Sequence, residues 1–394
     1  MEINLNRNVK IPDPLKVERY RRSPELGPKI LFFSGGSALK GVSKKLIEYT
    51  YNSFHIITPF DSGGSSAKIR EAFKMMAVGD LRNRLMALAD QKVKGNPAIY
   101  DLFSYRLPKK EKEGLINIIY EMIQGTHPLV IDIPNPMQTI ICNHLRFFIN
   151  KMPINFDLRG ANIGNLVLTG GYLNNNDDIE AVLFIFSKLV ESHGLVKPVI
   201  NKNLNLVAAL ENGSIVKGQS LITGRDFPKI TSPIKNLYLT ENLNHPLPYK
   251  VEIKESVKKI IKKAELICYP MGSFYTSLIA NLIPKGIGSS VAENICPKVY
   301  IPNTFSDPEQ LGLNLLDSIK TLLKYLEKES PLQGIKKYIN FILLDSKNGS
   351  YPFDLNLPEI KKLGVELIDT KLISQASHPY VDPDLLIKVL LSLT

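Results

Sequence analysis

The chain alternates short apolar runs with segments of helical periodicity. An apolar run at 29–33 ("KILFF") leads into a glycine pair, and residues 38–51 then carry apolar side chains at the spacing of an amphipathic helix. A second apolar run, "FHIIT" at 54–58, follows directly. A strand, a glycine turn, a helix and a strand in this order form a βαβ unit, which predicts a parallel sheet.

The same alternation returns in the last third of the chain. Four further apolar runs there precede or follow helical patterns: "AELIC" (264–268), "KVYIP" (298–302), "NFILLD" (340–345) and "VELID" (365–369). We therefore predict an α/β fold, a Rossmann-like, doubly wound and mainly parallel sheet in three α/β/α layers.

Three regions depart from this alternation. Residues 206–218 ("LVAALENGSIVKG") are two short runs joined by Asn212-Gly213, which predicts a small β-hairpin appendage. Residues 105–155 consist of helical patterns and loops, which predicts a helical insertion. Residues 1–28 are polar and rich in proline and arginine, and we expect an extended N-terminal arm. Residues 29–394 are then expected to form a single domain.

Composition narrows the class of protein. The chain has 394 residues, 44% of them hydrophobic, so it can bury a sizeable core. Its formal net charge of +11 suits anionic partners. Part of that charge lies at 250–263, where lysines face away from an apolar stripe. We favour a solvated helix face over a nucleic-acid contact there, and we do not expect nucleic acid as a partner.

The uncharged stretch 266–284 contains proline, glycine and serine, so we expect a strand, a turn and a helix rather than a membrane span.

Cysteine usage and the first residues suggest a compartment. The three cysteines have no CxxC spacing, which is typical of reduced thiols rather than of disulfides or a zinc site. The first residues, "MEINLNRNVKIPDP", contain no apolar segment of a signal peptide. We therefore expect a cytoplasmic protein.

Candidate chemistry gathers in three glycine-containing turns at predicted strand ends, where doubly wound sheets bind ligands. The first is "SGGSAL" at 34–39, in which Ser34, Gly35, Gly36 and Ser37 would let a phosphate approach the backbone at a helix N-terminus. An ordinary tight turn explains this stretch as well.

The second turn is "FDSGGSSAKIR" at 60–70. Asp61 offers a carboxylate for a cation or a hydroxyl, and Gly63 and Gly64 permit left-handed backbone. Ser65 and Ser66 would bind phosphate oxygens or, in the simpler reading, cap the following helix.

The third turn is "YPMGSFYTS" at 269–277, where Gly272 and Ser273 begin a helix that continues through Tyr275 and Thr276. Two other segments place polar residues at helix starts. Asp80 is expected to cap a helix carrying Arg82, Asn83 and Arg84. Arg159 and Asn165 stand before "LVLTGG". The six histidines show no H-x-x-x-H spacing, which argues against a histidine metal site.

These turns, in this order, resemble the 2-phospho-L-lactate transferase and gluconeogenesis-factor (CofD/YvcK-like) family. "SGGSAL" resembles the family's GGGTGL, "FDSGGSSAKIR" resembles ADDGGSSGRLR, and "AVGDLRNRLMALA" resembles PPGDIRNCLVALA. "RGANIGNLVL", "LVAALENGSIVKGQS" and "AELICYPMGSFYTSLIANLIPKGI" match further family motifs. The similarity runs from about residue 29 to the C-terminus and leaves out much of 105–155.

The resemblance implies a nucleotide-type ligand. One branch transfers a phospholactyl group from a guanosine diphosphate-linked donor to a deazaflavin alcohol with magnesium. The other branch binds UDP-sugars and has a regulatory role in carbon and cell-envelope metabolism. The family's Asp-Asp pair is Asp61-Ser62 here, so one candidate magnesium ligand is missing.

We therefore favour a binding protein for a nucleotide, a UDP-sugar or another diphosphate-linked molecule, with the phospholactate transferase as the alternative. In the transferase reading Asp61 is the catalytic and metal-binding residue and Mg²⁺ is the metal. The expected ligand- or phosphate-binding residues are Ser34, Gly35, Gly36, Ser37, Gly63, Gly64, Ser65, Ser66, Asp80, Arg82, Asn83, Arg159, Asn165, Gly272, Ser273, Tyr275 and Thr276. We expect no tightly bound organic cofactor, and a homodimer stays open.

Overall fold

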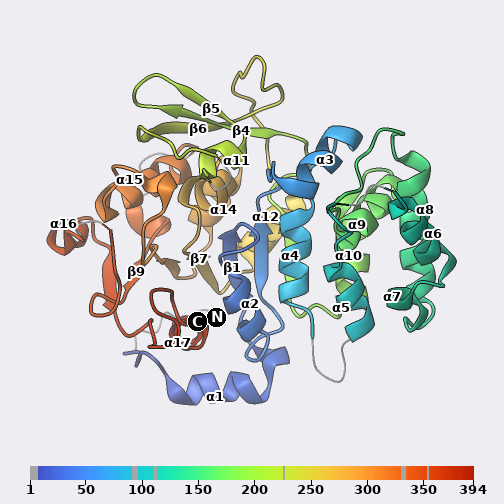
Figure 1. The fold of residues 1–394 in the computed structure, drawn as a ribbon. Helices are drawn as coiled ribbons and strands as arrows, with labels where there is room; N and C mark the ends of the chain where they lie inside the picture. Colours follow the sequence, from blue (N-terminus) through green and yellow to red (C-terminus); the bar gives the residue numbers. More distant parts are fainter. Residues whose placement is uncertain (1–7, 91–95, 111–112, 225–226, 330–333, 353–354) are drawn as a thin grey trace.

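A computed structural model gives the fold of the chain (Figure 1). It describes residues 8–90, 96–110, 113–224, 227–329, 334–352 and 355–394. Within these ranges, a seven-stranded sheet forms the centre of the molecule, and a three-stranded sheet lies above it.

The central sheet has the strand order β10-β9-β8-β7-β1-β2-β3, and all its pairings are parallel. The strands are β1 (Ile30–Ser34), β2 (Phe54–Ile57), β3 (Leu195–Pro198), β7 (Leu266–Tyr269), β8 (Lys298–Tyr300), β9 (Phe341–Leu344) and β10 (Glu366–Asp369). Each expected apolar run contributes one strand, and helices cover both faces. The doubly wound three-layer fold is confirmed. The order reverses between β1 and β7, and this reversal is where such sheets bind ligands.

The buried strands divide the core between the two faces of the sheet. Phe32 of β1 packs on one face with α1 (Pro14–Arg22), α2 (Lys40–Leu46) and α17 (Pro383–Ser392). Phe33, its neighbour, points to the other face, toward α12 (Glu255–Lys262), α14 (Ile287–Glu293) and α15 (Leu315–Leu326). Alternate side chains of a strand point to opposite faces, so each β1 residue serves one layer.

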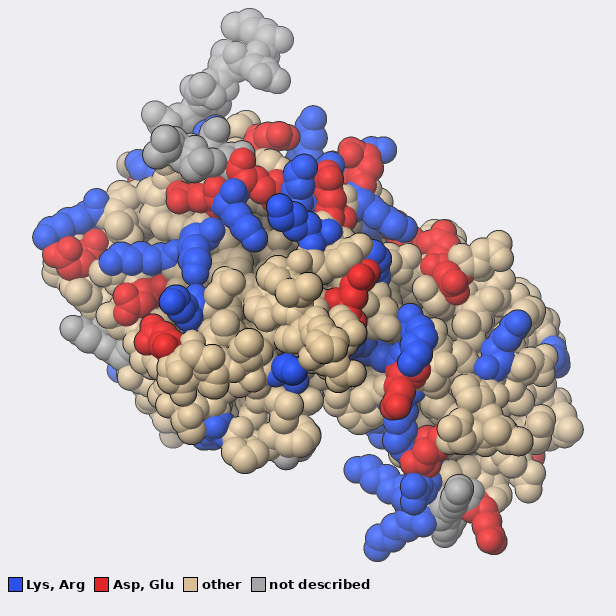
Figure 2. Space-filling view, turned by 90° about the horizontal axis from the view of Figure 1, so that it is seen from above, with Lys and Arg blue, Asp and Glu red and all other residues tan. Residues whose placement is uncertain are grey.

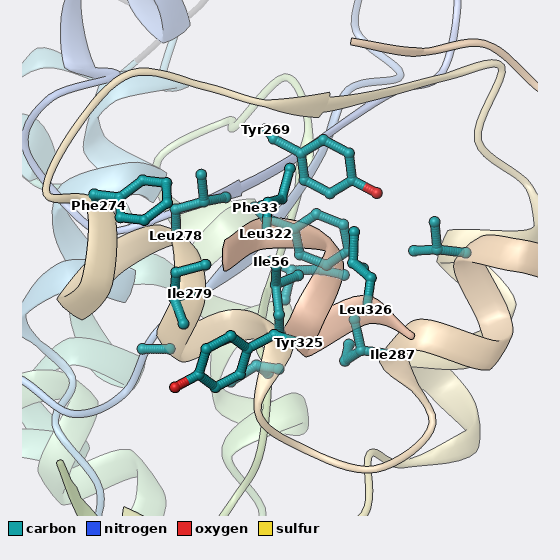
Figure 3. Packing of buried hydrophobic residues seen from close by; sticks show 14 of the residues in the cluster. Phe33, Ile56, Tyr269, Phe274, Leu278, Ile279, Ile287, Leu322, Tyr325 and Leu326 are labelled. Carbon is teal, nitrogen blue, oxygen red and sulfur yellow. The ribbon is translucent and has the colours of Figure 1, made fainter. Parts of the chain in front are cut away.

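The core directly below the strand reversal is aromatic (Figure 3). Phe33 of β1 stacks on Tyr269 of β7 with ring centroids 5.8 Å apart. The π-helical segment η2 (Phe274–Ile279) adds Phe274, Leu278 and Ile279, and α13 (Ala280–Leu282) continues it. The stretch 266–284 is thus a strand, a turn and short helical segments, as expected. These contacts fix β1 and β7 side by side and so fix the turns that follow them.

A helical lobe packs beside β2 and β3, toward the right of Figure 1. It comprises α3 (Gly64–Phe73), α4 (Gly79–Ala87), α5 (Pro97–Ser104), α6 (Leu115–Gln124), α7 (Pro128–Ile131), α8 (Met137–Lys151), α9 (Ile163–Asn174) and α10 (Ile179–Leu189). The expected insertion at 105–155 supplies α6, α7 and α8. It packs closely on α9, which comes from the part of the chain with family motifs.

The appendage is larger than the hairpin that the sequence indicates. Strands β4 (Asn205–Leu210) and β5 (Ile215–Lys217) pair antiparallel across the turn at Asn212-Gly213, where Gly213 has φ +85°. A third strand, β6 (Ile234–Thr240), pairs with the other edge of β4, and α11 (Gln219–Thr223) lies between β5 and β6. The remaining segments are η1 (Pro24–Leu26), η3 (Pro308–Gln310), η4 (Ile335–Lys337) and α16 (Leu357–Lys362).

The described part of the N-terminal arm is not extended. Residues 14–22 form α1, with Pro14 at the first helical position and Asp13 as its N-cap through a 3.1 Å bond from the Lys16 amide. Val17 is buried against the core, and the Asp13 amide donates to Ser392 of α17. A proline at the first turn favours a helix start, a signal that the high proline content of the segment concealed.

Candidate functional site

The first and third glycine turns line one pocket at the strand reversal. Its lining includes Ser34, Gly35 and Ser37 after β1, together with Gly272 and Ser273 after β7. The enclosed volume is about 30 Å³, and Ser277 of η2 closes one side. We call this the switch-point pocket. The sequence therefore located two turns, 235 or more residues apart, that the fold brings together.

A buried arginine holds the first turn in place. Arg84 of α4 is fully buried, and its Nη2 donates to Ser34 Oγ at 3.2 Å and to the Gly35 carbonyl at 2.8 Å. Burial lowers the pKa of Arg84 to about 10, while the charge of Asp80 opposes that shift. Asn281 adds a bond from its Nδ2 to the Ser34 carbonyl at 3.1 Å. The sequence placed Arg84 on the same helix as Arg82 but assigned no site role to Arg84 or Asn281, because neither lies in a glycine turn.

Gly36 serves packing against α4. A Cβ at this position would overlap the carboxylate of Asp80, and a Cβ on Gly35 would come within 2.5 Å of Ser277 Oγ. Asp80 itself lies in the first turn of α4, whose N-cap is Val78 without a side-chain bond. The expected capping role of Asp80 is therefore wrong. Its carboxylate instead lies against the first glycine turn.

The second turn lies on the other side of the α4 N-terminus. Asp61 Oδ1 accepts a bond from the Gly63 amide at 3.0 Å, and a Cβ on Gly79 would come within 3.2 Å of Asp61 Oδ2. The same Cβ would overlap Ser66 Oγ, so Ser66 and Asp61 both border the start of α4. Ser65 Oγ accepts from Asn165 Nδ2 at 3.2 Å. The neighbouring oxygen of Asn165, Oδ1, is buried without a hydrogen-bond partner.

The serines of this turn do not cap the helix. Helix α3 begins at Gly64, which has φ +51°, and Gly63 occupies the N-cap position without a side-chain bond. The alternative in which Ser65 or Ser66 caps the helix is therefore wrong. Ser65 instead meets Asn165, and Ser66 packs beside Gly79.

Ser62, which stands where the family has its second Asp, points to the appendage. Its Oγ accepts from the Ser220 amide at 2.9 Å and bonds to Ser220 Oγ at 3.1 Å. Ser220 lies in α11, so Ser62 joins the second turn to the three-stranded sheet.

The third turn is largely satisfied by carboxylates of the chain itself. The amides of Tyr275 and Thr276 both donate to Glu309 Oε2 at 2.8 Å, and Thr276 Oγ1 donates to Glu309 Oε1 at 2.6 Å. Asp307 Oδ2 accepts from the Phe274 amide at 2.8 Å. Asn303 exchanges bonds with the amide and carbonyl of Gly272, both at 2.8 Å.

This arrangement places Tyr275 and Thr276 in a buried structural network. Glu309 is 1% exposed, and the Tyr275 hydroxyl donates to the Ile234 carbonyl at 3.0 Å. Burial raises the pKa of Glu309 to about 8, with a further rise from the charge of Asp307, although the donors oppose it. Burial also raises the pKa of Asp307. The sequence pattern of the turn does not predict its hydrogen-bond acceptors, Asp307 and Glu309, because they lie more than 30 residues away in the chain.

The expected arginines lie apart from the switch-point pocket. Arg82 is buried, and its guanidinium donates to the Phe103 carbonyl at 3.1 Å and to Asn83 Oδ1. Arg159 is exposed and forms an ion pair with Asp157 at 2.8 Å, which Lys68 shares at 2.7 Å. The structure thus gathers Asp61, Ser65, Ser66, Asp80 and Asn165 around α4, but it ties both arginines to other partners.

The fold and the switch-point pocket define a Rossmann-like, doubly wound α/β protein with its candidate site at the strand reversal. A family model described as 2-phospho-L-lactate transferase CofD matches residues 30–373. The chain belongs to this family.

The similar proteins are named either as gluconeogenesis factors or as members of the UPF0052 family. The chain is 28% identical over 360 residues to the gluconeogenesis factor of Bacillus subtilis, covering 88% of this chain and 92% of that protein. It is 26% identical over 380 residues to a putative gluconeogenesis factor of Nostoc, covering 93% and 68%. A crystal structure of a UPF0052 family protein from Bacillus halodurans superimposes with a TM-score of 0.67 at 22% identity, over 93% of this chain and 99% of that one. That likeness supports the fold.

The residues that the structure describes lack two features. They contain no helix with both the length and the apolar character that a bilayer crossing requires. In the same ranges, histidine, cysteine, aspartate and glutamate side chains do not come together in threes as a metal site. Mg²⁺ is often held by one or two carboxylates together with substrate phosphates, so carboxylates such as Asp61 and Asp80 fit its donor preference.

Proposed function

We propose that the protein binds a nucleotide or nucleotide-sugar through its diphosphate at the mouth of the switch-point pocket. One observation carries the proposal: glycine turns from β1 and β7 line one pocket at the reversal of strand order. The enclosed volume is close to that of one water molecule, so the phosphates would sit at the mouth and the nucleoside outside it.

Charge supports the same class of ligand. The chain has a formal net charge of +11. Seen from above, a notch in the surface is bordered on one side by Lys and Arg side chains with Asp and Glu side chains among them, so the positive excess is that of the chain as a whole (Figure 2). A positive field of this kind favours association with anions. Because the named relatives are gluconeogenesis factors, we propose a regulatory role in carbon metabolism.

A thermal-shift and calorimetric screen tests the proposal. Nucleoside diphosphates, UDP-sugars and guanosine diphosphate-linked compounds are compared with and without Mg²⁺. A specific ligand at 100 times its Kd stabilises the folded state by about 2.7 kcal/mol, which is an easily measured shift. Absence of a shift with every compound, at concentrations up to several millimolar, would contradict the proposal.

Phospholactate transfer is the second candidate. The family model that matches the chain is described by that activity, and two carboxylates, those of Asp61 and Asp80, border the start of α4. In this reading they would hold Mg²⁺ with the donor diphosphate, and the metal would neutralise the leaving group. Product formation from a guanosine diphosphate-linked phospholactate and a deazaflavin alcohol, dependent on Mg²⁺, distinguishes the transferase from a binding protein.

A further inference from the structure

Three lysines line a cavity at the amino ends of β8 and β9, which we call the lysine cavity. It has a volume of about 540 Å³, and its lining includes Lys298, Lys336, Lys337 and Asn340. Lys298 is the first residue of β8, whereas the switch-point pocket lies after the last residues of β1 and β7. Because these strands are parallel, the two sites lie at opposite ends of the sheet.

Lys298 is a buried cation, 2% exposed. Its Nζ donates to the carbonyl of Asn294, at the C-terminus of α14, and to the carbonyl of Cys296 at 3.0 Å. An ammonium group carries three donors, so one N–H is left for a ligand. Buried charges are normally paired, yet the ion pairs within the described ranges do not include Lys298.

Two exposed lysines lie close to this buried one. Lys336 and Lys337 belong to η4 and line the same cavity. Burial lowers the pKa of Lys298; Cys296 opposes that shift, and the charge of Lys337 adds to it. The ammonium groups of Lys298 and Lys337 are therefore within electrostatic range of each other. In the part of the chain that the structure describes, no aspartate or glutamate lines the lysine cavity.

Asn340 holds the lysines in this arrangement. Its Oδ1 accepts from the Lys298 amide at 2.9 Å, and its Nδ2 donates to the Lys336 carbonyl at 3.0 Å. These bonds tie η4 to the start of β8 and fix the orientation of the side-chain amide. Because that amide carries two N–H donors, Asn340 keeps one of them for a ligand.

This set of groups suits a phosphate monoester. Lysine ammonium groups act as point charges, and the described lining contains no guanidinium, the planar fork that pairs with carboxylates. A phosphate monoester carries a charge of about −1.5 to −2 at pH 7 and three acceptor oxygens. Such a group offsets three neighbouring positive charges and accepts from the N–H groups that Lys298 and Asn340 leave free.

The lysine cavity also has room for the organic part of an ester. A volume of several hundred Å³ is in the range of small-molecule sites. Ile295, which is 95% exposed, and Ile335 add apolar surface to the lining. An adjoining cavity of about 210 Å³ shares Ile295, Lys336 and Asn340 and adds Glu366, whose carboxylate can accept from ligand hydroxyls.

We propose that the lysine cavity binds the phosphate group of a small organic phosphate ester, with Lys298, Lys336 and Lys337 as its cationic ligands. The organic part of the ester lies against Ile295 and Ile335. The proposal does not depend on nucleotide binding at the switch-point pocket.

Methyl NMR on the full chain, labelled at the isoleucine δ1 and methionine ε methyl groups, tests the proposal. Signals of Ile295 and Ile335 report the lysine cavity, and the signal of Met271 reports the switch-point pocket. The probes are glycerol 3-phosphate, 3-phosphoglycerate, ribose 5-phosphate and inorganic phosphate, all titrated at an ionic strength held constant with sodium chloride.

The variants remove charge from the two lysines of η4, because they are exposed and their replacement should leave folding intact. The test is the double variant Lys336→Gln, Lys337→Gln. Its matched control is Lys44→Gln, Lys45→Gln, which makes the same chemical change in α2, outside the lysine cavity. Melting temperatures of both variants should stay close to that of the unmodified protein.

At least one ester is expected to shift the Ile295 or Ile335 signal saturably. Its Kd should rise about tenfold or more in the Lys336→Gln, Lys337→Gln variant, because two of three cationic ligands are lost, and should not change in the control. If inorganic phosphate binds as tightly as the esters, the phosphate site is supported and its ligand is free phosphate. Absence of saturable shifts at both isoleucines up to several millimolar, or an equal Kd in the test variant, would overturn the proposal. Shifts at Met271 alone would also overturn it and would assign the phosphate to the switch-point pocket.

Discussion

The turns after β2 and β7 look alike in sequence and differ in what satisfies them. Both place glycine and serine just before a helical segment, as "DSGGSS" and "PMGSFYTS". After β2, the only hydrogen bond described for the Asp61 carboxylate comes from the Gly63 amide of its own turn, and Ser65 meets Asn165. After β7, the helix-start amides donate to Asp307 and Glu309 from a distant loop. The local pattern is the same, and the long-range partners differ.

The difference has an electrostatic basis. The first amides of a helix have no partner within the helix and attract negative charge. A ligand phosphate or a carboxylate of the chain satisfies them equally well. After β7 the chain supplies its own carboxylates for the amides of Phe274, Tyr275 and Thr276. Gly272, Ser273 and Ser277 of the same segment line the switch-point pocket. A glycine-serine turn therefore indicates an anion-attracting helix start, and the fold decides which anion occupies it.

The largest effect is expected from removing the carboxylate after β7. Glu309→Ala leaves the amides of Tyr275 and Thr276 without partners in a buried site and opens a cavity. Leaving two buried amide donors without an acceptor and opening a cavity costs about 3 kcal/mol or more of unfolding free energy, measurable by urea titration. Glu309→Gln is the matched control, because its carbonyl can still accept both amides. A loss below about 1 kcal/mol in Glu309→Ala would refute the contrast between the turns.

The same carboxylate predicts a pH dependence. Burial raises the pKa of Glu309 from 4.5 to about 8. Between these values the folded protein binds more protons at this group than the unfolded chain, so the unfolding free energy should fall as pH rises from about 4.5 to 8. Above pH 8 the contribution levels off. Denaturant titrations across this range should show the decline, and Glu309→Gln should flatten it. A wild-type curve that rises over the whole range would contradict the assignment.

A smaller effect is expected at the turn after β2. In Asp61→Asn the side-chain oxygen can still accept from the Gly63 amide, so the melting temperature without ligand should stay close to that of the unmodified protein. If Asp61 serves a cation or a ligand hydroxyl, affinity for the nucleotide-sugar should fall about tenfold, or about 1.4 kcal/mol, by calorimetry. A lower melting temperature with unchanged affinity would make Asp61 a turn residue only.

The sequence predicted the strands of the sheet and the glycine turns, because both depend on the pattern of neighbouring residues. Each apolar run is a strand, and the parallel order places strand ends at one edge. It did not predict β6, the helix α1, the contact of Arg84 with the first turn or the role of Glu309, because these depend on contacts between distant segments. Gly36 illustrates the limit: its missing side chain makes room for Asp80, a neighbour that no spacing rule identifies.

The smallest expected effect concerns the bond that joins the turn after β2 to the appendage. Ser62 Oγ accepts from the Ser220 amide at 2.9 Å, so Ser62→Ala should lower the unfolding free energy by about 1 kcal/mol, the typical net contribution of one such hydrogen bond.

Ser62→Asp introduces the residue that the family has at this position and keeps an acceptor for the Ser220 amide, so the stability of this variant should match that of the unmodified protein. If Ser62→Asp also increases affinity for a nucleotide-sugar, and does so only with Mg²⁺, the second carboxylate of the family pair is a metal ligand. Equal affinities in Ser62→Asp and the unmodified protein would show that this position serves to hold the appendage, and that the two glycine turns differ in their partners within the chain.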